Sequence, residues 1–403
     1  MKKNNFKRFL ILILSLAFVV SCSDDSDNPI VDPENQEYAF LRDGVSTVSY
    51  SGQTTRLKQA NELYDGLNSE NSNETNLSLM FNGDGTNSAG FMDGTLNGTT
   101  KIIGSKTSAS AIAGSAATKA KFDEMIQDYS NNVVPNFNNA ASDGSAGKIC
   151  YTNNDGSASC YELNAKGQEL DQLFFKGLIG AFTLDQIVNN YLHPNQLESG
   201  TRTQDNDNNV LSSGKNYTDM EHKWDEAFGY LYGETEDITS NFGLPESSDE
   251  KGNLLMKYFQ KVELNYEAGI AQRVYEAFID GRQAIVDKDY AARENSARIL
   301  KVELSKVIGY YAIHYLNDYV NKIANNEIAR AHHSLSEAWG FILSLQFTNN
   351  GENQPYMSKA AVEDTLDNYF SDFHNMNTVN ITASGTGMID QIKSAFNNTL
   401  MID

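Results

Sequence analysis

Apolar residues recur at the three- and four-residue spacing of α-helices through most of the chain after residue 168. This spacing predicts helices over residues 168–192, 218–232, 254–285, 290–323, 327–345, 359–373 and 388–396. The helix over 218–232 also has a start signal, because Thr218 and Glu221 stand three residues apart as in a capping box. Earlier in the chain the same spacing predicts helices over 55–67 and 116–129.

Polar and small residues dominate the rest of the N-terminal third. Asn, Gly, Ser and Thr fill residues 68–115 and 131–147, which predicts long loops. Beyond these loops the pattern shows no ladder of alternating strands. The predicted fold is all-α, a helical bundle with long irregular loops in its N-terminal third.

Two of the predicted helices carry nearly the same string. The first reads HKWDEAFGYL from His222 to Leu231, and the second reads HSLSEAWGFI from His333 to Ile342. His, Glu, Ala and Gly are identical in register, and the aromatic character matches. This predicts an internal duplication of the bundle.

The spacing places the shared polar residues on one face of each helix. His222, Glu226 and Gly229 stand at i, i+4 and i+7, and a stripe of large apolar residues lies roughly 200° away. We call the His–Glu–Gly face the polar stripe of each helix. Both faces are expected to be buried, with the two polar stripes turned toward a shared interior. His222, Glu226, His333 and Glu337 then offer four nitrogen and oxygen ligands, a set suited to iron or zinc.

A second interpretation needs no metal. A buried glutamate must be paired, ligated or protonated, so each His/Glu pair could be a hydrogen-bonded link between central helices. Arg282 is a candidate counter-ion for either glutamate, and Asp225 is a further acid beside the first pair. Both interpretations stay open at this stage.

The other histidines and the known catalytic patterns add little. His332 is expected to be exposed, and His314, in an aromatic segment, is expected to be a core histidine. The sequence contains no Ser/His/Asp set, no phosphate-binding loop and no HExxH zinc motif.

The N-terminus has the features of an export signal. Four basic residues precede an apolar run over 9–20 that is too short to cross a bilayer. The run leads into Cys22 through VVS, which resembles the lipobox of bacterial lipoproteins. Residues 1–21 are therefore predicted to be a signal peptide, with Cys22 lipidated and the chain anchored to a membrane. An ordinary signal peptide with a chance cysteine is the less favoured interpretation.

The segment after Cys22 is acidic and polar. Residues 22–37 contain SDDSD directly after the cysteine and form a predicted tether, with the helical domain over 38–403. The tether is either a solvated spacer or an acidic export tag for the outer face of the outer membrane, and we favour the second. The formal net charge of −22 argues against nucleic acid as a partner.

Two cysteines remain after Cys22. Cys150 and Cys160 flank NNDGS, a turn sequence that can fold back as a hairpin. In an exported protein this spacing predicts a structural disulfide. A metal pair is less favoured because no histidine lies nearby.

Several motifs together resemble one known family. They are the lipobox, YSGQTTR from Tyr50, MEHKWDEAFGY from Met220, Gly281-Arg282 and HSLSE from His333. The chain resembles a Bacteroidota lipoprotein family known as domain of unknown function 4856, which is similar in setting to imelysin-like proteins. Imelysin-like proteins are exported, duplicated helical bundles with an HxxE motif proposed to bind metal. Here the spacing is HxxxE, although Asp225 supplies an acid at the shorter distance from His222.

The resemblance implies a role in iron or haem acquisition together with an outer-membrane transporter. A surface lipoprotein that binds iron, zinc, haem or an iron carrier is the first hypothesis. A metallopeptidase-like hydrolase is the second, and it is less favoured because neither string has the acid that a zinc peptidase uses as its base. A structural or adhesion module without a metal site is the third.

Overall fold

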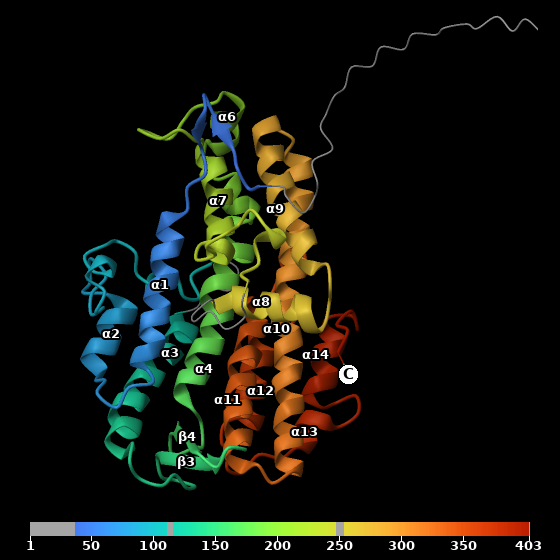
Figure 1. Ribbon diagram of the computed structural model, residues 1–403. Helices are drawn as coiled ribbons and strands as arrows, with labels where there is room; N and C mark the ends of the chain where they lie inside the picture. The colour runs from blue at the N-terminus through green and yellow to red at the C-terminus, as the bar shows by residue number, and fades with distance from the viewer. Residues whose placement is uncertain (1–36, 111–115, 247–253, 403) are drawn as a thin grey trace, which may run out of the picture.

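The computed structural model describes residues 37–110, 116–246 and 254–402, and Figure 1 shows their arrangement. The predicted signal peptide, Cys22 and the tether before residue 37 lie outside the described residues. The first third forms β1 (Leu41–Arg42), β2 (Val45–Ser46), α1 (Ser51–Gly66), α2 (Glu74–Asn82), η2 (Gly94–Leu96), η3 (Gly104–Lys106), α3 (Ala116–Asp128), η4 (Tyr129–Val133), η5 (Val134–Asn136), β3 (Gly147–Thr152) and β4 (Ala158–Leu163).

The remainder of the described chain is helical. Its elements are α4 (Leu170–Leu178), η6 (Ile179–Tyr191), α5 (Pro194–Leu197), α6 (Arg202–Asp207), α7 (Asp219–Tyr232), η7 (Asn241–Gly243), α8 (Leu254–Asn265), α9 (Ile270–Asp287), α10 (Tyr290–Ala324), α11 (Ile328–Ser344), η8 (Leu345–Phe347), α12 (Lys359–Tyr369), α13 (Val379–Thr382) and α14 (Met388–Ala395). The all-α fold predicted from the apolar spacing is confirmed.

The core of the bundle is the continuous helix formed by α4 and η6. Every residue of α4 is buried, and so are nearly all residues of η6, including several polar and charged side chains such as Lys176 and Asp185. The α4 half packs against α11, and the η6 half packs against α7. Figure 1 shows α1, α2 and α3 on one side of this helix and α9 to α14 on the other, with α8 crossing them.

The second half of this helix is wound as a π-helix. The change begins where Gly180 meets Ser344 of α11, whose Oγ accepts a hydrogen bond of 3.1 Å from the Gly180 N–H. A Cβ atom at Gly180 would lie only 2.3 Å from the Ser344 Cβ. Because glycine has no Cβ, the two backbones can meet at this crossing. The sequence predicted the helix over 168–192 but not its change of winding.

Two other helix predictions need correction. Residues 254–285 were predicted as one helix, but the structure has α8 and α9, separated at Gly269 with a φ of 86°. The apolar positions continue in phase across this break, so periodicity alone could not reveal it. Within 68–115, predicted to be loop, α2 forms behind Asn73, whose side chain accepts the Asn76 N–H as an N-cap.

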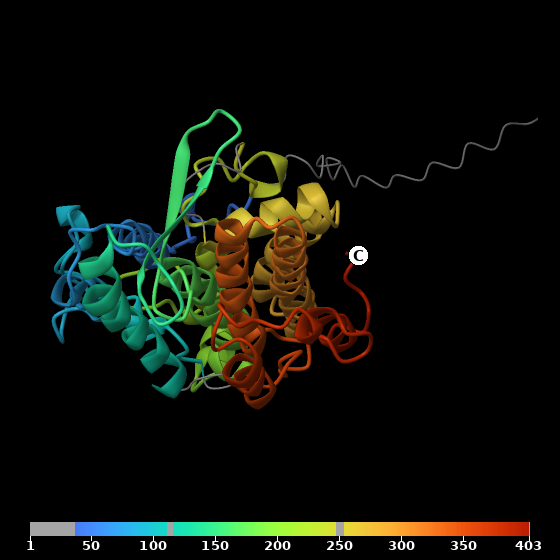
Figure 2. The ribbon, with the colours of Figure 1, turned by 90° about the horizontal axis from the view of Figure 1, so that it is seen from below.

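The cysteine-flanked turn forms an antiparallel hairpin. Strands β3 and β4 pair with Cys150 directly opposite Cys160, and the two cysteines form a disulfide. Asp155 closes the turn by accepting hydrogen bonds from the N–H and the hydroxyl of Ser157. Seen from below in Figure 2, this hairpin stands out from the helices. It brings Tyr161 toward the start of α11.

Candidate functional site

The polar stripe of α7 lies against α1. Helix α7 begins with the predicted capping box of Thr218 and Glu221, which fixes where the helix starts. His222 stacks on the ring of Tyr217 with centroids 4.6 Å apart and 15° between the planes, and its Nε2 lies 3.9 Å from Glu226 Oε2.

Glu226 has two closer partners than His222. Lys223 Nζ lies 2.5 Å from its carboxylate, and the Gln53 amide of α1 donates a hydrogen bond of 3.0 Å. Burial lowers the pKa of His222, so this imidazole is neutral at pH 7. Burial raises the pKa of Glu226, but the charges of Lys223 and His222 outweigh it and lower the pKa overall. The first pair is therefore a carboxylate held by a lysine.

The polar stripe of α11 lies against α4. His333 stacks on Tyr161 of the hairpin, with centroids 4.5 Å apart and 11° between the planes. Its Nδ1 lies 2.6 Å from Glu169 Oε2, and its Nε2 lies 3.4 Å from Glu337 Oε2. Lys176 Nζ of α4 lies 3.4 Å from the other oxygen of Glu337. The second pair is thus also held by a lysine, with one more carboxylate on the imidazole.

Because of this extra carboxylate, His333 and His222 carry different charges at neutral pH. Burial alone lowers the pKa of His333, but the hydrogen bond and charge of Glu169, with the charge of Glu337, raise it to about 9. His333 is therefore an imidazolium at neutral pH, unlike His222. Nearby Asp171 is fully buried, and burial raises its pKa well above the usual range. The cluster of Lys176, Glu337, His333 and Glu169 is charge-balanced.

The structure does not turn the two polar stripes toward one another. Lys223 lies over the ring of Tyr191, at the end of η6, whereas Lys176 stands in the middle of α4. Fifteen residues of continuous helix separate these two points, which is up to roughly 22 Å at the rise of an α-helix and somewhat less here because residues 179–191 are wound as a π-helix. The expectation of a shared interior is corrected, because each polar stripe faces its own neighbouring helix. Four ligands cannot meet there at the roughly 2 Å bonds of a metal ion.

The glycines of both strings lie at close backbone crossings. A Cβ on Gly340 would lie 2.4 Å from the Lys176 Cβ and 2.7 Å from the Gly177 nitrogen. A Cβ on Gly229 would lie 2.3 Å from the Tyr50 Cβ. The close approach expected at these glycines is present, with α4 and with the start of α1.

Arg282 is buried, but it contacts different acids from the expected ones. Its Nη1 lies 3.1 Å from Glu221 Oε1 and its Nε lies 3.0 Å from Asp225 Oδ1. These two acids stand four residues apart on α7, on another face from Glu226. The prediction that Arg282 pairs with Glu226 or Glu337 is therefore wrong. Burial raises the pKa of Asp225 to about 6, although the charge of Arg282 opposes this.

The remaining histidines also differ in part from expectation. His332 was expected to be exposed but is buried, and its Nδ1 lies 2.8 Å from the Gly167 carbonyl oxygen. The reason is that the loop before α4 folds over this side of α11. His314 contacts the Tyr266 hydroxyl at 2.6 Å through its Nδ1. It is partly buried among aromatic rings, close to what the sequence suggested.

These positions do not fit a resident metal or haem. In each polar stripe a lysine ammonium already stands beside the glutamate, where a cation would have to bind. Across residues 37–110, 116–246 and 254–402, no group of three or more His, Cys, Asp or Glu side chains is arranged to hold a metal ion. The interpretation of the His/Glu residues as structural polar links between helices agrees better with this geometry, with each glutamate held by a lysine.

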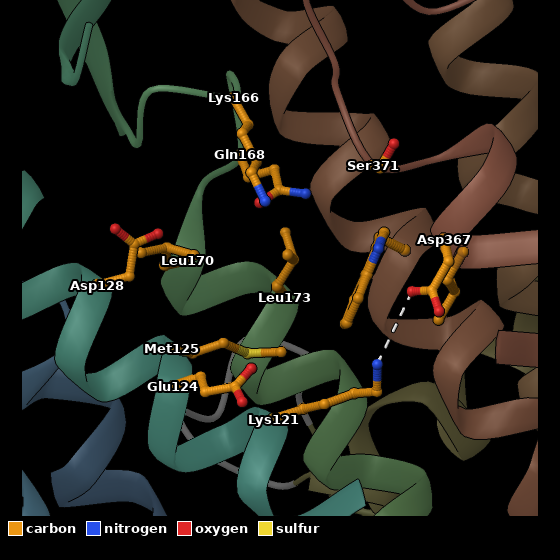
Figure 3. Close-up of a pocket in the computed structure, with 12 residues that line it drawn as sticks. Lys121, Glu124, Met125, Asp128, Lys166, Gln168, Leu170, Leu173, Asp367 and Ser371 are labelled. Carbon is orange, nitrogen blue, oxygen red and sulfur yellow. Dashed lines mark ion pairs between the residues drawn. The ribbon is translucent and has the colours of Figure 1, made fainter. Parts of the chain in front are cut away.

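Sequence reasoning missed a pocket on the other side of α11. It has a volume of about 280 Å³ and lies between α3, α4, α11 and α12. Its apolar lining residues are Met125, Leu170, Leu173, Trp339 and Leu366, and its polar ones are Lys121, Glu124, Asp128, Lys166, Gln168, Asp367 and Ser371. Figure 3 shows Leu173 and Met125 pointing into the pocket, with Lys166 and Gln168 at one end.

Sequence reasoning also missed Lys176 and Glu169. The one signal for Lys176 was a lone cation inside the apolar run LFFKGLIGAF, a position that a buried lysine takes only with a partner. Glu169 gave no such signal, because it meets His333 across 164 positions of sequence.

Comparison with known proteins gives one match. A family model described as "Domain of unknown function (DUF4856)" matches residues 35–398. No curated protein and no solved structure matches the chain. In the described part of the chain, no helix has both the length and the apolar character needed to cross a bilayer.

Proposed function

The chain belongs to the family described as domain of unknown function 4856, and from this premise we propose that it is an exported, lipid-anchored binding protein for a small organic ligand. The pocket beside Trp339 is the observation that carries the proposal. Five apolar side chains line it beside seven polar ones. It is therefore more polar than most small-molecule sites, which favours a small ligand that has both an apolar part and a charged or polar group.

The lysines of the two polar stripes support an organic ligand over a bare metal ion. Lys176 and Lys223 neutralise the glutamates that a metal would need. A metal-activated water, as a metallopeptidase-like hydrolase requires, has no place beside them. We therefore propose a binding role rather than an enzymatic one.

The cellular setting of the proposal comes from the N-terminus and the family resemblance. Lipidation of Cys22 anchors the chain to the outer membrane of a Bacteroidota-type cell, at its outer face. The role in iron or haem acquisition together with an outer-membrane transporter stays the setting of this proposal, with a small organic ligand in the pocket. Intact haem is disfavoured, because about 280 Å³ is below the roughly 300–1,000 Å³ of pockets for drug-sized ligands.

Metal analysis of the full mature protein, purified without a metal-affinity tag, tests whether the His/Glu pairs hold a metal ion, as the alternative to an organic ligand requires. We expect substoichiometric iron and zinc in the wild type, with no change in His333→Ala or Glu226→Gln. Stoichiometric metal that either substitution removes would overturn the proposal.

Fractionation of cells tests the anchoring part. Cys22→Ala is expected to abolish lipid labelling and to release the protein from membranes, while Ser23→Ala leaves both unchanged. Membrane association that survives Cys22→Ala would contradict the lipid anchor. Added protease should cleave the wild-type protein on intact cells, and complete protection would place it on the periplasmic side.

A further inference from the structure

The two strings place an aromatic residue at the same position with different surroundings. Phe228 in α7 and Trp339 in α11 follow the shared glutamate by two residues. Phe228 is fully buried and has the ring of Tyr38 stacked on it, with centroids 3.8 Å apart and planes 7° apart. In the α7 copy, a planar ring supplied by the chain itself therefore covers the aromatic residue.

The α11 copy has a pocket in that place. Trp339 lines the pocket together with Leu173 and Met125, and no aromatic ring of the described residues stacks on it. Its apolar neighbours come from α3, α4 and α12, which hold the walls in place on three sides. Trp339 is only 8% exposed, so a ligand could reach only the small part of the indole that lines the pocket. Because aromatic rings favour other rings at offset-stacked distance, that part offers a contact for a ring, as Phe228 does for Tyr38 in the other copy.

The polar residues of the pocket carry both signs of charge. Lys121 Nζ lies 3.9 Å from Asp367 Oδ1, and the Asp367 side chain is 68% exposed. Lys166 stands at the opposite end beside Gln168, as Figure 3 shows. Glu124 and Asp128 supply negative charge on the α3 side. A ligand in this pocket thus meets an ammonium at either end and carboxylates along one side.

We propose that the pocket binds a small molecule with a planar aromatic ring that carries a charged group, and that the ring stacks on Trp339. This inference rests on the proposed function and narrows its ligand to one chemical class. Such a ring occurs in aryl carboxylates and in aromatic amino acids, and both are small enough for about 280 Å³. Both classes of ligand would make the same contact between their ring and the indole. They differ in the charged group that the ring carries.

Calorimetric titration of the full mature chain, with Cys22→Ser to avoid lipidation, tests the proposal. The probes are L-tryptophan, 2,3-dihydroxybenzoate and tryptamine, with L-leucine as the non-aromatic control. We expect at least one aromatic probe to bind and leucine to bind about two- to tenfold more weakly, since stacking contributes about 0.5–1.5 kcal/mol beyond burial. Zwitterion, anion and cation probes identify which charged group the pocket selects.

Substitutions assign the contact to Trp339. Trp339→Phe keeps a ring and is expected to retain binding, whereas Trp339→Leu is expected to weaken it about two- to tenfold. Trp224→Phe is the matched control, because Trp224 is fully buried in the core, away from the pocket. Circular dichroism and the unfolding midpoint show whether each variant is folded.

Lys166→Ala tests the charged end of the pocket. This substitution should weaken the anionic probe more than tryptamine, because it removes one of the two ammonium groups that line the pocket.

Two outcomes overturn the inference. One is that no aromatic probe binds, and the other is that folded Trp339→Leu binds as tightly as the wild type. Neither outcome affects the metal and anchoring tests of the proposed function, whose failure would be seen separately.

Discussion

The ammonium of Lys176 lies 3.4 Å from the carboxylate of Glu337, and both side chains are at least 90% buried. Lys176 comes from the centre of α4 and Glu337 from the polar stripe of α11, so this contact ties together the two helices at the middle of the bundle. It also accounts for a glutamate that, seen in the sequence alone, suits a metal ligand equally well. The presence of Lys176 beside it makes Glu337 a member of an ion pair rather than a metal ligand.

Removing one member of this pair should destabilise the protein strongly. Lys176→Met is expected to lower the free energy of unfolding by about 3 kcal/mol, because it removes the ammonium from a buried ion pair and leaves the Glu337 carboxylate with the His333 imidazolium alone. The double variant Lys176→Met/Glu337→Met should recover most of that loss, since both charges are then absent. Urea unfolding of the mature chain measures both effects.

Lys322→Met is the matched control for this experiment. Lys322 lies 3.7 Å from Asp318 on the same helix, with both side chains partly exposed. Such surface pairs contribute about 0–1 kcal/mol. If Lys176→Met and Lys322→Met unfold at the same urea concentration, the buried pair does not have the structural role assigned to it.

The charge on His333 makes stability depend on pH in a defined range. Its pKa is raised to about 9 in the folded protein, against about 6.5 in an unfolded chain. The stabilisation is therefore fully present below pH 6.5 and is lost as the pH rises through 9. The difference in stability between wild type and His333→Gln should shrink by on the order of 1–3 kcal/mol between pH 6 and pH 10.

His222→Gln provides the comparison, because burial lowers the pKa of His222. His222 is already neutral above pH 7, so the stability difference for His222→Gln should stay constant from pH 7 to pH 10. Chemical unfolding at several pH values measures both series. A His333→Gln difference that is equally flat would show that the imidazole is not charged in the folded protein.

Local sequence signals were reliable where the structure depends on neighbouring residues. The start of α7 could be predicted because Thr218 and Glu221 satisfy the first backbone N–H groups within one turn. The hairpin could be predicted from its turn residues. The break before α9 could not, because Tyr258, Val262, Tyr266 and the residues that follow keep the helical period through Gly269.

The candidate site was harder to predict because its partners come from distant segments. The polar stripes and their close glycine crossings follow from helical geometry, and the sequence predicted them. Which helix each polar stripe meets does not follow, since Glu169 and Lys176 reach α11 from more than 160 positions away. Arg282 illustrates the same limit, because a buried cation was expected correctly but its acids were not.

The disulfide should stabilise the hairpin locally. Cys150 and Cys160 close a loop of about ten residues, which in the chain-entropy model is worth up to about 3 kcal/mol. Thiol labelling of unreduced, denatured protein is expected to find neither cysteine. The double variant Cys150→Ser/Cys160→Ser should speed amide hydrogen exchange in residues 147–163 while the exchange in α10 stays unchanged. If amide exchange in the hairpin is the same in the wild type and in the double variant, the paired strands are stable without the disulfide.

The two glycines at the helix crossings give the most local test of the fold. Gly340→Ala places a Cβ 2.4 Å from Lys176 and 2.7 Å from the backbone of Gly177, so α4 and α11 must move apart. Overpacking of this kind costs about 1–3 kcal/mol, and the better helix propensity of alanine, worth about 1 kcal/mol, offsets part of it. The two terms leave a net loss of about 0–2 kcal/mol. Because the Gly177 backbone cannot move aside as a flexible side chain can, we expect the upper part of that range, about 1–2 kcal/mol, in urea unfolding.

Gly94→Ala is the control, because nothing lies within 4 Å of the added Cβ at that position. It should change the unfolding free energy by no more than about 0.5 kcal/mol. Gly229→Ala should behave like Gly340→Ala, since its Cβ meets Tyr50 at 2.3 Å. If Gly340→Ala is as stable as Gly94→Ala, then α4 and α11 do not cross as closely as the structure shows. The contact between Lys176 and Glu337 would then need a different explanation, because the same crossing brings their backbones together.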